Sequence, residues 1–225
     1  MDLPIHELLA NIDWSDIWLA SLETLAMVGG SLLFTVLLGL PLGVVLFLTG
    51  PRQLLEHRRV YGALSLLVNL LRSMPFVILL ILLIPFTLAV VGTSIGVLGA
   101  IPPLIVGATP FFARLVENVL REVDRGIIEA SQAMGATLPQ IIFGAVLPEA
   151  FPGLLGAVTV TAITLVSYSA MSGVIGGGGL GDLAIRFGYQ RFQADVMIVT
   201  VAILLVMVQL LQMFGDRLVH RFTRS

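Results

Sequence analysis

Long stretches without a charged residue are the feature that most constrains the fold of this chain. The interval between Glu23 and Arg52 contains none, and the interval between Arg59 and Arg114 contains only Arg72. A helix of about 20 apolar residues is long enough to cross the roughly 30 Å hydrocarbon core of a bilayer. With 57% apolar and 12% charged residues, the chain has too few polar side chains to cover a water-soluble globule. The pattern therefore predicts an all-α integral membrane protein.

The arrangement of these stretches predicts five transmembrane helices in one membrane domain, residues 1–225. We expect the spans at about 20–48, 60–88, 95–120, 151–171 and 196–215. Nine of the twelve basic residues follow or close the first, third and fifth spans; they are Arg52, Arg58, Arg59, Arg114, Arg121, Arg125, Arg217, Arg221 and Arg224. Basic residues concentrate in short cytoplasmic loops. The N-terminus is therefore expected outside and the C-terminus in the cytoplasm.

The two tryptophans precede the first span. Trp14 and Trp18 are four residues apart, as expected for an aromatic anchor at the membrane interface. Four apolar residues share this region: Leu8, Leu9, Ile12 and Ile17. Together they predict a short amphipathic helix on the outer membrane surface.

The charged residues exclude several functions. The net charge is −2, so there is no basic excess for nucleic acid. All twelve basic residues are arginine, so the chain has no P-loop lysine and no Schiff-base lysine. It also has no cysteine, and its three histidines, His6, His57 and His220, are far apart. We therefore expect no catalytic residue, no metal site and no cofactor on this chain, and we do not expect an enzyme.

A polar segment, residues 117–149, separates the third and fourth spans. A first helix is predicted over 125–134, ending at Gly135, which adopts a left-handed cap without steric cost. Thr137 and Gln140 have the spacing of a capping box, which predicts a second helix that Pro148 ends. From periodicity alone, an interfacial connector is favoured over an element that docks in a partner's groove.

The residues of this segment also resemble a known motif. Glu129, Ala130 and Ser131, then Gly135, then Leu147 and Pro148, are similar to the EAA loop of ABC-importer permeases. The chain departs from the usual pattern at Ser131 and at Ala145. The resemblance implies that the loop, about 125–149, is the coupling-helix pair that inserts into a cleft on a separate ATPase subunit. It favours docking over the connector.

Further motifs extend the resemblance over nearly the full length. The segments are 23–27 (ETLAM), 72–76 (RSMPF), 84–86 (IPF), 91–96 (VGTSIG), 114–118 (RLVEN), 168–171 (YSAM) and 178–181 (GGLG). In combination they resemble permeases of the methionine uptake family of ABC importers. The resemblance implies a type I ABC importer permease fold that moves an amino acid, methionine, from periplasm to cytoplasm by alternating access. An osmoprotectant or another amino acid is the alternative substrate.

The same resemblance implies the partners and the location. A dimer of ABC ATPase subunits would bind the cytoplasmic face and carry ATP and magnesium. A second copy of the chain would complete the path, and a periplasmic or lipoprotein substrate-binding protein would deliver the solute. The chain would lie among lipid in the bacterial inner membrane as a multi-pass protein.

Candidate residues for a solute path come from two places. Arg72 is the one charge inside a predicted span. We favour a structural role over substrate contact: the side chain either snorkels to the interface or pairs with backbone carbonyls that Pro75 leaves without a partner. The fourth span is rich in Thr and Ser, which indicates helix packing or a path lining. The resemblance places a gate near Tyr168, Ser169 and Met171. The glycine run 176–179 with Gly181 is interpreted as an outer hinge or gate loop rather than a helix interior.

Two other hypotheses for the function are disfavoured. An ion-coupled secondary transporter needs intramembrane acids, and only Glu23, at an outer edge, is expected within a span. An intramembrane enzyme would need an Asp dyad or a Ser-His pair, and neither is expected.

Overall fold

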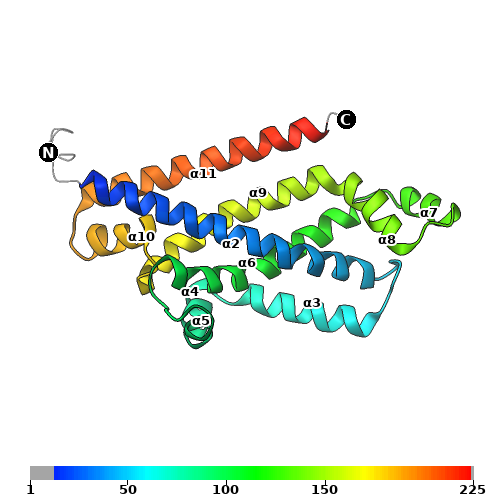
Figure 1. Ribbon diagram of the computed structural model, residues 1–225, viewed down its shortest axis with the longest axis horizontal. Helices are drawn as coiled ribbons and strands as arrows, with labels where there is room; N and C mark the ends of the chain where they lie inside the picture. Colours follow the sequence, from blue (N-terminus) through cyan, green and yellow to red (C-terminus); the bar gives the residue numbers. More distant parts are fainter. Residues whose placement is uncertain (1–12, 224–225) are drawn as a thin grey trace. The chain divides into compact units, whose positions relative to one another are not determined.

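Every regular element of this protein is a helix in the computed structural model, which describes residues 13–223 (Figure 1). The long helices are α2 (Trp14–Thr49), α3 (Arg58–Ser73), α6 (Gly96–Arg121), α9 (Leu147–Ser172) and α11 (Ala194–Thr223). The short helices are α4 (Phe76–Leu82), α5 (Ile84–Val91), α7 (Arg125–Ala133), α8 (Leu138–Ile141) and α10 (Gly179–Leu183). Two π-helical segments (Ile142–Val146 and Ala184–Tyr189) and one 3-10 turn (Gly173–Ile175) complete the set. The predicted all-α class is confirmed.

The first long helix begins earlier than expected. Asp13 accepts hydrogen bonds from the Ser15 hydroxyl and backbone N–H, at 2.6 and 3.0 Å, which caps the start of α2. The Ser15 hydroxyl in particular holds the pKa of the Asp13 carboxyl below its usual value. Trp14, Ile17 and Trp18 therefore belong to the span helix, and a separate surface helix is wrong for them. The other residues of that prediction, Leu8, Leu9 and Ile12, lie outside the described residues.

Four helical segments of residues 13–223 are long and apolar enough to cross a membrane: Trp14–Thr49, Gly96–Arg121, Leu138–Ile175 and Ala194–Thr223. A fifth span would require α3 and α4 together, and the chain is bent by 103° between them. The second span expected over 60–88 is therefore interrupted by a bend, and the count of five spans stays a prediction. The break falls at Pro75, which favours extended backbone at the preceding Met74 (ψ 132°), so the helix ends there.

The helix that follows the polar segment does not end at Pro148. The chain stays helical from Leu138 through the π-helical turn Ile142–Val146 and into α9. The π turn shifts the backbone pairing, so that the N–H of Leu147 donates to the carbonyl of Ile142. Pro148 then follows directly after the π turn, whose shifted pairing accommodates a residue without an N–H. The predicted short second helix is corrected to the beginning of a long one.

The chain packs as two compact units. Unit 1 contains the described residues of 1–33 together with 75–106 and 162–211, and unit 2 contains 34–74, 107–161 and the described residues from 212 onward. Four helices, α2, α6, α9 and α11, contribute residues to both units. The expectation of one membrane domain stays a prediction.

Unit 1 has a core where α2, α10 and α11 meet. Ile17 and Ala20 of α2 are buried against Leu180 and Leu183 of α10 and Val196 of α11. In unit 2, the larger core joins α2, α6, the polar segment and α9. Its buried members are Phe47, Leu48, Phe112, Val116, Leu120, Ile128, Ile141, Val146, Ala150 and Ala157. This second core positions the residues that resemble the EAA loop.

Candidate functional site: a helical corner and a buried charge cluster

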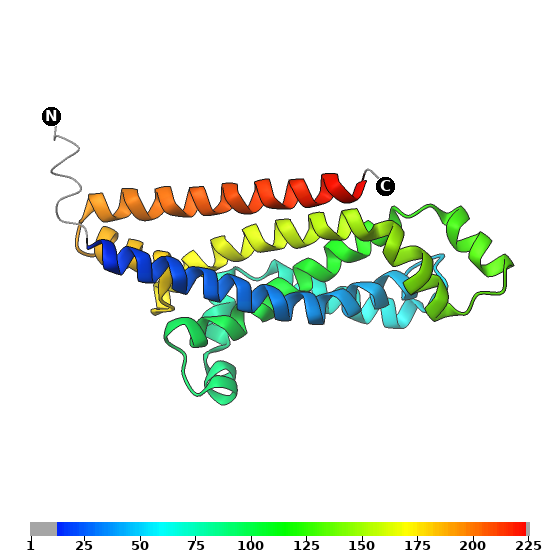
Figure 2. The same cartoon turned by 45° about the horizontal axis from the view of Figure 1, so that its top comes forward.

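The polar segment forms a corner of two helices, which we call the helical corner (residues 125–146). Asp124 caps α7 by accepting from the N–H of Gly126 at 2.6 Å. Gly135 has a φ of +79°, and the N–H groups of Gly135 and Ala136 donate to the carbonyls of Gln132 and Ser131. The predicted end of the first helix at Gly135 is confirmed. Figures 1 and 2 show α7 and α8 next to each other across this turn.

The second helix of the corner starts with the predicted capping box. The side-chain oxygen of Gln140 accepts from the N–H of Thr137 at 2.8 Å and from its hydroxyl at 2.9 Å. Pro139 lies in the first turn, where a missing N–H leaves no internal bond unmade. Local sequence signals therefore define both ends of the turn between α7 and α8.

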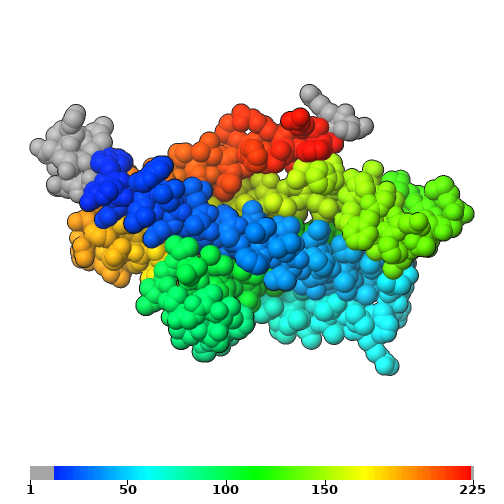
Figure 3. All heavy atoms as spheres, in the orientation of Figure 1, coloured from blue at the N-terminus to red at the C-terminus, as the bar shows by residue number. Residues whose placement is uncertain are grey.

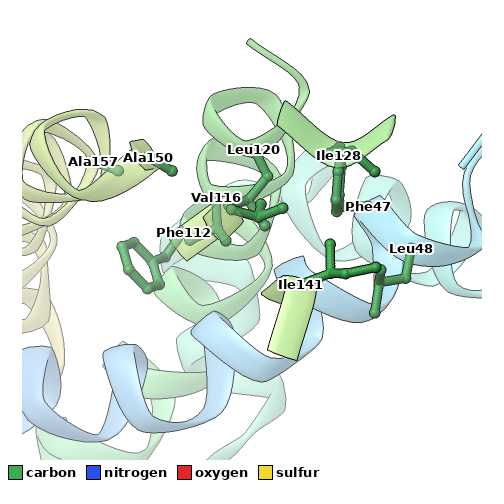
Figure 4. Packing of buried hydrophobic residues seen from close by; sticks show 10 residues of the cluster. Phe47, Leu48, Phe112, Val116, Leu120, Ile128, Ile141, Ala150 and Ala157 are labelled. Atoms are coloured by element: carbon green, nitrogen blue, oxygen red, sulfur yellow. The ribbon is translucent and has the colours of Figure 1, made fainter. Parts of the chain in front are cut away.

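One apolar residue on each helix anchors the corner to unit 2. Ile128 of α7 is 8% exposed and Ile141 of α8 is 3% exposed. Figure 4 shows Ile128 beside Phe47 and Ile141 beside Leu48, both at the end of α2. Burying an aliphatic side chain of this size contributes about 1.5–3 kcal/mol. The corner is therefore packed against the end of a span.

The residues of the EAA-like motif differ in exposure. Glu129 is exposed and pairs with Arg125 at 3.1 Å, and Ala130 is exposed beside it. Ser131, where the motif usually has alanine, donates its hydroxyl to the carbonyl of Ile127 at 2.8 Å. That bond stays within α7, which explains how a polar side chain is accommodated here. Gly135 and Pro148 are exposed and Leu147 packs partly against the core.

Two exposed apolar side chains of the corner were not among the predicted site residues. Met134, at the end of α7, is 81% exposed, and Phe143, in the π turn, is 71% exposed. Figure 3 shows this part of the chain, in yellow-green, as open surface. Exposing large apolar side chains to water on a short polar element is unfavourable, which is typical of a surface that a partner covers. The sequence does carry a signal for Phe143, because this residue lies off the apolar stripe that Ile141, Ile142 and Val146 form on the helix.

A buried charge cluster lies at the end of α6, in unit 2. Glu117 is 1% exposed and its carboxylate accepts from Arg114, from Arg121 at 2.7 Å and from the Tyr61 hydroxyl at 3.1 Å. Arg114 also donates to Ser65 at 2.8 Å and to Asn69 at 3.0 Å. The cluster therefore ties α3 to α6.

The cluster corrects one sequence expectation. Glu117 lies within the candidate span α6, so the expectation that only Glu23 falls in a span is wrong. A buried charge is tolerated here because both guanidinium groups and a hydroxyl satisfy it. The spacing of Arg114, Glu117 and Arg121 on one helix face is the signal that was available in the sequence. Tyr61, which comes from another helix, had no such signal.

The three residues expected at a gate have different surroundings in unit 1. Tyr168 stacks on Phe76 of α4, with ring centroids 4.2 Å apart and planes 3° apart. Ser169 is buried and donates to the carbonyl of Val166 at 2.8 Å. Met171 is 43% exposed and lines an apolar groove formed with α11. The structure therefore does not gather the three side chains into one site.

Arg72 belongs to unit 2 and lies in the last turn of α3. Its guanidinium is 5.9 Å from the centroid of the Phe111 ring, a cation–π distance. A positive charge in the last turn also interacts favourably with the helix dipole. These two contacts fit the favoured structural role.

The glycine-rich segment of unit 1 is a turn followed by a short helix. Residues 176–178 lie outside any helix, and Gly176, Gly178 and Gly179 have positive φ, as the loop interpretation expects. Gly181 lies inside α10, so the expectation is wrong for this glycine, and the role of a hinge or gate stays a prediction. The N–H of Gly179 donates to the Glu23 carboxylate at 2.7 Å, and the N–H of Leu180 donates to the Thr24 hydroxyl at 2.9 Å. These two bonds satisfy N–H groups at the start of α10 and fix it to α2.

Within residues 13–223, no group of three or more His, Asp or Glu side chains is placed to hold a metal ion. The expected absence of a cofactor on this chain stays a prediction.

The fold and the sequence define the class of this protein. The family described as binding-protein-dependent transport system inner membrane component matches residues 36–225, and the chain belongs to this family. It is a multi-pass protein of the bacterial inner membrane.

Individual relatives narrow the class further. The chain is 51% identical over 202 residues to the probable D-methionine transport system permease protein MetI of Vibrio cholerae, covering 90% of each chain. It is 46% identical over 206 residues to the methionine import system permease protein MetP of Bacillus subtilis, covering 92% of this chain and 93% of the relative.

Solved structures agree with this assignment. One, described as inward-facing conformations of the MetNI methionine ABC transporter, matches with a TM-score of 0.89 and 48% identity over 99% of both chains. An amino acid ABC transporter matches with a TM-score of 0.79 at 20% identity, which supports the fold alone. The fold is that of a type I ABC permease.

Proposed function

We propose that the chain is the permease subunit of an ATP-driven importer that carries methionine from periplasm to cytoplasm. The observation that carries the proposal is the 46–51% identity, over at least 90% of this chain, to permeases named for methionine transport. ATP and magnesium are bound by a separate ATPase subunit, since a chain without lysine has no P-loop of its own. The N-terminus lies outside and the C-terminus in the cytoplasm, as the arginine distribution favours.

The helical corner is the docking element for the ATPase. Glu129, Ala130 and Ser131 lie on α7, Gly135 forms the turn, and Leu147 and Pro148 are the first residues of α9. The corner offers a partner two exposed apolar side chains, Met134 and Phe143. An apolar projection of this kind fits a groove on a partner subunit.

Movement passes from the corner to the membrane through one continuous helix. From Leu138 to Ile175 the chain forms a single candidate span with no flexible linker between α8 and α9. The buried Ile128 and Ile141 tie the corner to α2 as well. Nucleotide-driven closure of an ATPase dimer would therefore displace α2 and α9 together, which supports alternating access.

The solute path is completed by a second copy of the chain. Four or five spans enclose little space by themselves, and a twofold dimer places a path at the interface. Tyr168, Ser169, Met171 and Arg72 are the residues proposed near this path or its gate. A periplasmic or lipoprotein binding protein delivers the solute from outside, and lipid surrounds the dimer.

The buried carboxylate of Glu117 does not favour an ion-coupled transporter. All of the contacts of Glu117 described above are structural ones, to two arginines and a tyrosine hydroxyl, on helices α6 and α3. A coupling carboxylate must exchange its cation during each cycle, whereas this one joins two helices. Another amino acid or an osmoprotectant remains the alternative substrate.

Co-purification and uptake test the proposal. A tagged chain should bring down an ATPase subunit that hydrolyses ATP, and vesicles containing the complex should accumulate labelled methionine only with ATP inside. Excess unlabelled osmoprotectant should not compete. Uptake that continues without the ATPase and follows an ion gradient would contradict the proposal.

A matched pair of phenylalanines tests the docking role. Phe143 and Phe192 are both exposed, at 71% and 89%, and only Phe143 lies on the corner. Phe143→Ala should weaken ATPase binding by about tenfold or more, as expected for a buried aromatic anchor, whereas Phe192→Ala should not. Equal affinities in the two variants would remove the corner from the interface.

A further inference from the structure

A pocket of about 510 Å³ lies in unit 2, beside the helical corner. It is formed by the end of α2, the connection to α3, the end of α6 and the helix α7. Its wall includes four charged residues, Arg52, Arg121, Arg125 and Glu129. The volume falls within the roughly 300–1,000 Å³ of small-molecule sites.

The wall of this pocket is positively charged, with three arginines and one carboxylate. Among the described residues, Arg121 uses one terminal nitrogen, Nη2, for Glu117 and Tyr61, and Arg125 uses Nε for Glu129. No ion pair joins the guanidinium of Arg52 to a residue in the described range. Each guanidinium carries five N–H donors, so most donors of the three remain available.

The positions of two of these arginines are fixed by their surroundings. Arg52 has a left-handed φ of +62°, and its N–H donates to the Glu56 carboxylate at 3.0 Å. A left-handed conformation is unfavourable for a non-glycine residue unless its surroundings maintain it. At Gly50, a Cβ would lie 2.8 Å from Nη2 of Arg121, so this glycine leaves room for the guanidinium.

We propose that this pocket binds a phosphate group, carried by an anionic phospholipid or free in solution. Planar guanidinium groups recognise phosphate through paired hydrogen bonds. The pocket lies where two candidate spans end, which is the depth of lipid headgroups. Phe47, Leu54 and Leu120 give its wall an apolar part that suits the glycerol and acyl chains of a lipid.

A bound phosphate would also affect the helical corner. Arg52 lies in the connection between α2 and α3, whereas Arg125 is the first residue of α7. A phosphate held by both would join these two segments by charge-assisted hydrogen bonds. The pocket therefore gives lipid or phosphate a means to stabilise the proposed docking element, an effect beyond the transport function itself.

Native mass spectrometry of the full chain, purified with its co-purifying subunits, tests the lipid arm. The complex is equilibrated with phosphatidylglycerol or, as the neutral comparison, phosphatidylcholine. Arg52→Gln and Arg125→Gln should each weaken phosphatidylglycerol retention by about tenfold, the effect of losing one charge-assisted contact. The control Arg59→Gln removes an exposed arginine outside the pocket wall and should retain the lipid.

Thermal unfolding tests the second source of phosphate. Inorganic phosphate should raise the unfolding temperature above that in chloride of equal ionic strength, and Arg52→Gln should abolish the shift. A response to phosphatidylglycerol alone assigns the site to lipid, and a response to inorganic phosphate alone assigns it to the free ion. If neither ligand distinguishes Arg52→Gln and Arg125→Gln from Arg59→Gln, the proposal is overturned.

Discussion

Gly181 and Gly135 both belong to motifs that the sequence singled out, yet the structure requires glycine at the two positions for different reasons. Gly181 lies inside α10 with ordinary helical backbone, and a Cβ there would overlap the backbone of Ala170 in α9. Gly135 has no described atom within 4 Å of its Cβ position, but its φ is +79°. The first glycine allows close packing, and the second allows a left-handed turn.

The same difference extends to the segments around them. In unit 1, Gly173 also faces backbone, since its Cβ would lie 2.5 Å from the amide nitrogen of Asp182. Glu23 and Thr24 also accept hydrogen bonds from the start of α10, so this segment is held by α2 as well as by α9. In unit 2, the helical corner is held by Ile128 and Ile141 while its tip stays exposed. Substitutions should therefore disrupt folding in unit 1 and partner binding in the corner.

The largest effect is expected for Gly181→Ala. The new Cβ meets backbone atoms of Ala170, which cannot move aside as a flexible side chain can. Overpacking of this kind should destabilise the protein by about 3 kcal/mol, the upper end of the usual range. Thermal unfolding of the purified protein measures the change. Gly29→Ala is the control in unit 1, because no described atom lies within 4 Å of its Cβ position and alanine favours a helix.

Thr24→Val sharpens the comparison because it removes both hydrogen bonds of the Thr24 hydroxyl, from the N–H of Leu180 and to the carbonyl of Ala20, with little change in side-chain volume. Thr24 is 1% exposed, and its loss leaves the N–H of Leu180 without its acceptor. A buried donor left unpaired should cost about 1–3 kcal/mol in the free energy of unfolding. Thr87→Val is the control, since the buried Thr87 hydroxyl has no partner among the described residues. If the two valine variants were equally stable, Thr24 would not be holding α10.

The sequence predicted most of the local structure of the corner because local signals define it. Gly135 and the pair Thr137 and Gln140 act within one helical turn, so their spacing alone predicts where α7 ends and α8 begins. The prediction that Pro148 ends the second helix was wrong because it did not take the preceding backbone into account. A proline ends a helix only where its missing N–H and its ring conflict with the preceding turn, and the π turn before Pro148 removes that conflict.

Contacts between segments far apart in the chain could not be predicted from the sequence. The stacking of Phe76 on Tyr168 and the bond from Tyr61 to Glu117 join residues far apart in the chain, and no periodicity predicts them. The loop expectation is wrong at Gly181 because helix propensity describes an isolated helix. In α10, close packing against α9 and the bonds to α2 outweigh the roughly 1 kcal/mol that a helical glycine costs.

Gly135→Val tests the other side of the comparison. Forcing a β-branched residue into the left-handed region should cost about 1–2 kcal/mol, less than the clash at Gly181. The protein should still insert in the membrane, whereas ATPase binding and methionine uptake should fall because α7 and α8 no longer meet at the same angle. Gly62→Val in α3 is the control, with no described atom within 4 Å of its Cβ position. Unchanged uptake in Gly135→Val would count against the docking role.

Glu129→Gln should have the smallest effect on stability and so separates folding from partner binding most clearly. Arg125 and Glu129 form an ion pair in which both side chains are 65% exposed. Exposed pairs four residues apart in a helix contribute about 0.3–0.5 kcal/mol, so the free energy of unfolding should change by no more than that. If Glu129 contacts the ATPase, the same variant should still weaken the complex several-fold, which a binding titration with the purified ATPase subunit measures. Arg58→Gln breaks another exposed pair, with Glu56, outside the corner and should leave that affinity unchanged. A loss of affinity shared by both variants would indicate an effect that is not specific to this carboxylate, whereas a loss confined to Glu129→Gln would place it in the interface.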